Sequence, residues 1–129
     1  LSIYYKDFEE ALYVLNLLYK EEKNIKYLEK EAEIYAYLNK SQESSNIYLT
    51  LFNSTEDRIS KREYFIKAIN SLIWGKKYKE AVSLAKKYED YFLNANDVTT
   101  LKFLLKVYLQ AGDLDSAHNL SSKILKGII

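Results

Sequence analysis

The residues able to do chemistry are few in this sequence, and their spacing does not assemble a catalytic centre. His118 is the only histidine and cysteine is absent, so the usual transition-metal ligands and the usual bases for nucleophilic catalysis are missing. Acidic pairs such as Glu9 with Glu10 and Glu89 with Asp90 are chain neighbours. On a helix such neighbours point about 100° apart and cannot converge on one bond. We therefore expect no enzyme, no cofactor and no metal site.

Charge and composition restrict the partners. The 19 basic and 18 acidic side chains leave a formal net charge of +1, so no overall positive excess favours nucleic acid. No apolar run reaches the roughly 18 residues that cross a bilayer, and we expect a soluble segment without direct membrane insertion.

Methionine is absent, which favours a fragment of a larger protein. Frequent Tyr, Lys, Asn and Ile suggest a bacterial source, with cytoplasm and periplasm both open.

The elements that must position any binding residues are predicted to be helices. Proline is absent and glycine occurs three times, so long helices are uninterrupted and strand turns are scarce. Apolar residues recur at helical spacing over residues 25–38, 58–74 and 96–110, and a second set of such stripes lies between them. The connections between successive helices are short enough to require antiparallel helix hairpins. Asp113 is well placed as a helix N-cap directly after Gly112.

A small residue recurs at nearly constant spacing in the second set of helices. Ala11, Ser45, Ala81 and Ala117 are separated by 34, 36 and 36 positions. Apolar or small residues follow each of them at helical intervals. A helical hairpin repeated in this way is typical of a solenoid, because one hairpin cannot bury its apolar face alone. We expect Ala81 and Ala117 to be almost fully buried between paired helices.

The repeated pattern resembles the tetratricopeptide repeat (TPR) family, whose second helix begins with Gly, an acidic residue, an aromatic residue and, three positions later, Ala. The last repeat matches it at Leu101, Leu104, Tyr108, Gly112, Asp113, Leu114 and Ala117. The third repeat has its Gly75 one position early. The family's small residue after the first-helix Leu is replaced by Glu33, Ile69 and Leu105, so helix pairs are expected to lie slightly further apart.

The resemblance implies one all-α domain over residues 1–129, a TPR-like α-solenoid of antiparallel helix hairpins, about seven helices in a right-handed superhelix. It would comprise a half repeat at 5–23 and repeats at 24–54, 57–93 and 96–127. In this family the first helix of each pair lines a concave face. The positions off the packing stripe there are Tyr27, Lys30, Ile34, Tyr37, Ile66, Asn70, Ile73, Trp74, Lys102 and Lys106.

Aromatic anchors beside long cations are typical of protein or peptide recognition. We therefore expect a scaffold or adaptor module for protein–protein interaction, with Trp74 as main anchor and an acidic partner segment near Lys102 and Lys106. A looser resemblance links the chain to bacterial envelope or exopolysaccharide-export proteins.

Three alternatives remain open from the sequence. The groove aromatics Tyr27, Tyr37 and Trp74 could stack on a carbohydrate polymer. The repeats could be a structural spacer, in which case Trp74 would pack on Tyr78 and the groove isoleucines would be buried between helices. The terminal segments "LSIYY" and "KGII" could also pair chains end to end, giving self-association.

Overall fold

The computed structural model describes residues 2–128, and their side chains over residues 6–127. Within residues 2–128 the chain forms seven α-helices and no strand, which confirms the all-α expectation. The chain divides after Lys76 into two compact units. Most of the terminal segments expected to pair end to end, residues 1–5 and 128–129, lies outside the described side chains.

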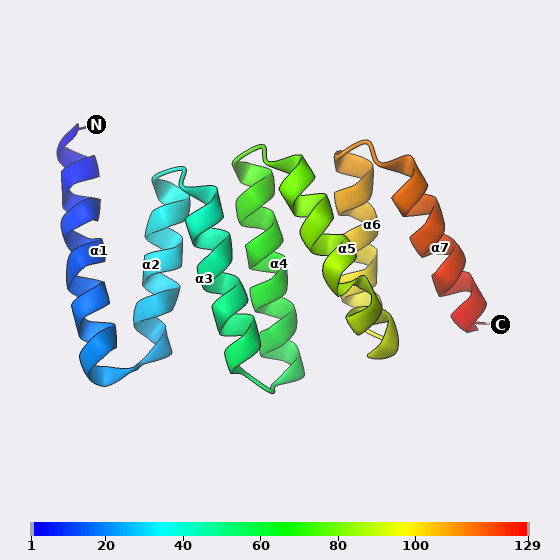
Figure 1. Ribbon diagram of the computed structural model, residues 1–129, viewed down its shortest axis with the longest axis horizontal. Helices are drawn as coiled ribbons and strands as arrows, with labels where there is room; N and C mark the ends of the chain where they lie inside the picture. Colours follow the sequence, from blue (N-terminus) through cyan, green and yellow to red (C-terminus); the bar gives the residue numbers. More distant parts are fainter. Residues whose placement is uncertain (1, 129) are drawn as a thin grey trace. The chain divides into compact units, whose positions relative to one another are not determined.

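The first unit is a row of antiparallel helices, each packed against the next in the chain. It contains four of the helices drawn in Figure 1: α1 (Ser2–Glu22), α2 (Ile25–Tyr37), α3 (Ser41–Ser54) and α4 (Arg58–Trp74). The expected spans 25–38 and 58–74 agree with α2 and α4 to within one residue. Because α3 reverses the chain between them, α2 and α4 run in the same direction.

Helix α3 presents small residues to both of its neighbours. The Ser44 hydroxyl donates a 2.8 Å hydrogen bond to the carbonyl oxygen of Ala32 on α2 and lies 3.1 Å from the Ser71 hydroxyl on α4. Ser45 is fully buried, and its hydroxyl has no hydrogen-bond partner among the described residues. Small side chains allow three helices to approach closely here, and Leu51, Phe52 and Phe65 fill the adjoining core.

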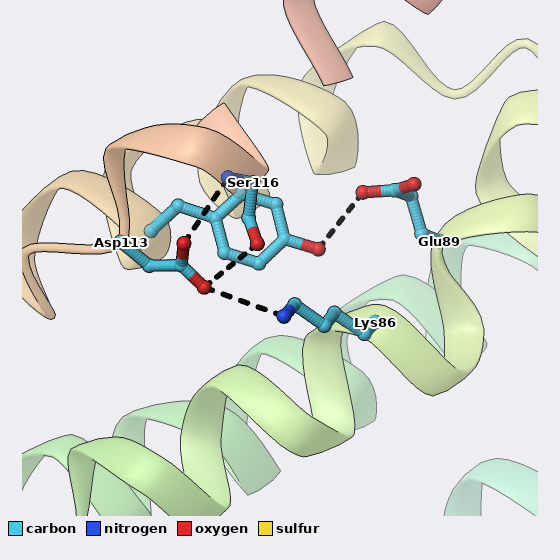
Figure 2. Close-up of polar contacts among 5 residues, drawn as sticks. Lys86, Glu89, Asp113 and Ser116 are labelled. Atoms are coloured by element: carbon cyan, nitrogen blue, oxygen red, sulfur yellow. Dashed lines mark hydrogen bonds and ion pairs between the residues drawn. The ribbon is translucent and has the colours of Figure 1, made fainter. Parts of the chain in front are cut away.

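The second unit consists of α5 (Tyr78–Asn94), α6 (Val98–Gln110) and α7 (Leu114–Ile128). Polar contacts link all three helices. The buried Tyr108 hydroxyl donates a 2.8 Å hydrogen bond to Glu89, and the Lys123 ammonium lies 2.9 Å from the other oxygen of that carboxylate. Figure 2 shows Lys86 of α5 pointing toward the Asp113 carboxylate, which also lies beside Ser116.

Asp113 caps the start of α7, as the sequence predicts. Its carboxylate accepts hydrogen bonds from the Ser116 backbone N–H at 3.1 Å and from the Ser116 hydroxyl at 2.7 Å, and lies 3.4 Å from the Lys86 ammonium. Gly112 before it has φ +76°, the left-handed conformation that glycine adopts without steric penalty. These bonds hold the pKa of Asp113 below its usual value, because the charged carboxylate is the better acceptor.

Two of the recurring small residues, Ala81 and Ala117, are buried, as expected. Ala81 is completely buried and Ala117 is almost so. Gly75 plays a different role from Gly112, because its φ is −83° and the left-handed position after α4 is taken by Lys76. Gly75 is instead required for close packing against Ser41 at the start of α3.

Candidate recognition cleft of the first unit

Two large aromatic side chains are exposed at the ends of α2 and α4. Tyr37, the last residue of α2, is 79% exposed, and Trp74, the last residue of α4 and the only tryptophan, is 71% exposed. Rings of this size are usually buried for most of their area in a folded protein. Their exposure marks this end of the helix pair as a candidate binding surface.

Tyr37 and Trp74 line one cleft between α2 and α4, with a volume of about 420 Å³. Helix α3 contributes Tyr48 to it. We call this feature the aromatic cleft; its lining residues are Glu33, Ala36, Tyr37, Tyr48, Lys67, Ser71 and Trp74. The cleft therefore combines apolar ring surface with one acidic and one basic side chain.

A hydrogen bond ties α2 to α4 one turn before the cleft. The Tyr64 hydroxyl of α4 donates a 2.7 Å hydrogen bond to the Glu29 carboxylate of α2. Burial, this bond and the nearby Glu29 charge raise the pKa of Tyr64 to about 12. Glu33 follows Glu29 by one turn on α2 and lines the cleft.

The charges in the aromatic cleft are unequally paired. The Glu33 carboxylate lies 3.4 Å from the Lys30 ammonium on the same helix. The Lys67 ammonium instead lies over the ring of Tyr48, 5.9 Å from its centroid. Among the described residues, Lys67 has no carboxylate within salt-bridge distance.

Three of the residues that line the cleft have further contacts or shifted pKa values that fix their state. The ring of Tyr37 packs on that of Phe8 of α1, with centroids 5.0 Å apart and a tilt of 50°. The Ser71 hydroxyl donates a 2.9 Å hydrogen bond to the Lys67 carbonyl oxygen, so its hydrogen is used within α4. Burial raises the pKa of Tyr48, and the Glu33 and Glu29 charges add to the effect, so this hydroxyl stays protonated at neutral pH.

The other residues predicted for the binding face have different environments. The Tyr27 hydroxyl donates a 2.7 Å hydrogen bond to Glu22, and Lys30 pairs with Glu33. Lys102 and Lys106 are exposed on α6 of the second unit. The remaining four are half-buried: Ile34, Ile66, Asn70 and Ile73. Of the predicted set, the structure places Tyr37 and Trp74 together in the aromatic cleft.

Sequence reasoning missed the other lining residues, Glu33, Ala36, Tyr48, Lys67 and Ser71. Tyr48 lies on α3, whereas the family resemblance assigns the concave face to the first helix of each pair, here α2 and α4. Lys67 precedes Trp74 by seven positions, which places both on one face of α4. That spacing is the signal that could have identified Lys67.

A second cleft, in the second unit, has a volume of about 380 Å³ and is mostly apolar. Its lining residues are Leu93, Asn96, Val98, Leu101, Lys123, Ile124 and Gly127. Among the described residues that line it, none is aromatic, and the one charged residue, Lys123, already pairs with Glu89. The aromatic cleft is therefore the better candidate for recognition.

No group of three potential metal ligands occurs in the part of the chain that the structure describes, and His118 is exposed on α7. Across that same part, every helix is too short or too polar to cross a lipid bilayer. Comparison with protein-family models, with curated proteins and with solved structures found no match.

Proposed function

We propose that this chain is a protein-interaction module that binds a segment of a partner protein in the aromatic cleft. On this proposal the helices form a TPR-like solenoid in a right-handed superhelix, within a larger scaffold protein. The repeated spacing of Ala81 and Ala117, together with their burial, supports the repeat assignment. A bacterial envelope or exopolysaccharide-export setting is the context that the resemblance suggests.

The shared exposure of Tyr37 and Trp74 in one cleft carries the proposal. Tryptophan and tyrosine dominate the binding energy of protein interfaces, since they offer a large rigid surface and lose little conformational entropy. Trp74 is the stronger anchor, because Tyr37 already has Phe8 against its ring. The spacer alternative expects the Trp74 ring to be packed against other side chains. The ring is largely exposed, which does not support that alternative.

Carbohydrate binding is the second candidate function. Flat aromatic faces beside polar groups also suit sugar rings, and Tyr37 and Trp74 lie beside Glu33 and Lys67 in the same cleft. The two charged side chains make a peptide the better fit, because both charges would have to be matched or left solvated beside a neutral sugar. Titration with neutral glucans of several linkages tests this alternative.

A selection experiment tests the proposed function. A displayed library of random nonapeptides is panned against the folded chain, and the enriched peptides are measured against Trp74→Ala and against a Lys102→Glu, Lys106→Glu pair. We expect Trp74→Ala to weaken binding by about 2 kcal/mol, roughly thirtyfold. If peptide binding were lost in the Lys102→Glu, Lys106→Glu variant and kept in Trp74→Ala, the recognition surface would lie on α6, and the proposal would be contradicted. Circular dichroism confirms that each variant is folded.

A further inference from the structure

The aromatic cleft has one charge without a matching partner. Glu33 is paired with Lys30, and Glu29 accepts the hydrogen bond of Tyr64. Lys67 has only the ring of Tyr48 beneath its ammonium, among the described residues. A cation–π contact leaves the three N–H donors of the ammonium available to an incoming acceptor. An anionic group is therefore the ligand feature that this cleft lacks.

The spacing of Lys67 and Trp74 along α4 sets the length of a peptide that contacts both side chains. Both line the cleft, and seven residues of α-helix separate them along α4. At 1.5 Å per residue this corresponds to about 10 Å along the helix axis. An extended peptide spans about 3.3 Å per residue. A segment lying along α4 would therefore reach from the ammonium to the indole in about three residues.

We infer that the partner segment is extended and carries an acidic side chain about three residues from a large apolar side chain. The carboxylate pairs with the Lys67 ammonium, and the apolar side chain packs between Trp74 and Tyr37. This inference rests on the proposed function and adds the chemistry of the partner. The recognised anion is a side-chain carboxylate within the segment, so a free chain end is not required.

Defined peptides test the inference, with Trp74 as the reporter because it is the only tryptophan. Peptides enriched in the selection are resynthesised with acetylated and amidated ends and without tryptophan or tyrosine, and their binding is followed by the emission of Trp74. Each peptide is paired with a version in which its acidic residue becomes the corresponding amide. The chain is tested as wild type, as Lys67→Met, which keeps an apolar stem, and as Lys102→Met, a matched exposed lysine on α6.

We expect the acid-to-amide change to weaken binding by about tenfold on wild type and on Lys102→Met, and to have little effect on Lys67→Met. The inference is overturned if enriched peptides shift Trp74 emission but lack the acidic residue. It is also overturned if the acid-to-amide change weakens binding equally on wild type and on Lys67→Met. Either result leaves the proposed function standing. Enriched peptides that leave Trp74 emission unchanged, or no enrichment at all, overturn both.

Discussion

Gly75 lies directly against Ser41. A side-chain carbon built at Gly75 would lie 2.6 Å from the Ser41 Cβ and would overlap the Ser41 hydroxyl oxygen. The φ of Gly75 is −83°, which any residue adopts, so its backbone conformation does not require glycine. Glycine is needed because the end of α4 approaches the start of α3 more closely than a methyl group allows. The same end of α4 carries Trp74.

The variant Gly75→Ala should therefore destabilise the chain by about 1–3 kcal/mol, through overpacking against α3. Gly127 supplies the control: it is the penultimate residue of α7, with open space around the position of a new side-chain carbon. Gly127→Ala should leave stability unchanged or raise it by up to about 1 kcal/mol, since alanine is the better helix former. Urea unfolding followed by circular dichroism measures both. Equal midpoints for the two variants would contradict the close approach at Ser41.

Three tyrosine–glutamate hydrogen bonds of similar length differ in burial. Tyr108 to Glu89 involves a fully buried tyrosine, Tyr64 to Glu29 is partly buried, and Tyr27 to Glu22 is exposed. Replacing each tyrosine by phenylalanine should destabilise most at Tyr108, by about 1.5–3 kcal/mol, because this tyrosine is fully buried and the Glu89 carboxylate, whose side chain is only 12% exposed, loses a donor. The effect should be smaller at Tyr64 and close to zero at Tyr27. Chemical unfolding of the three variants gives the order, and a large effect at Tyr27 would contradict it.

Stability at high pH should depend on Tyr64. Its pKa is raised from 10.0 to about 12 in the folded chain, so folding favours the neutral phenol. The stabilisation is fully present below pH 10 and is lost as the pH rises towards 12, because the unfolded chain then releases the proton more readily. Wild type should lose more stability than Tyr64→Phe over this range. Unfolding of both chains at pH 9 and at pH 11 measures the difference, and parallel losses would contradict the raised pKa.

The helices could be predicted closely because each carries an apolar stripe and ends at a short polar turn. The spans expected over 58–74 and 96–110 differ from Arg58–Trp74 and Val98–Gln110 by at most two residues. Tyr37 and Trp74 stand out in the sequence as aromatic residues off these stripes. Tyr48 does not, because its place in the cleft depends on the separation of α2 and α4, and Lys67 is indicated only by its spacing of seven positions from Trp74. That separation follows from contacts between distant residues, such as Tyr64 with Glu29.

The indole N–H resonance of Trp74 provides the most direct test that the aromatic cleft is the recognition surface. A ¹⁵N-labelled chain gives one such signal, because it has one tryptophan. Titration with an enriched peptide should shift this signal together with the backbone amides of Tyr37 and Lys67, while the amides of Lys102 and Lys106 stay in place. A peptide that binds and leaves the indole signal unmoved, with its shifts confined to α5, α6 or α7, would contradict the assignment of recognition to this cleft.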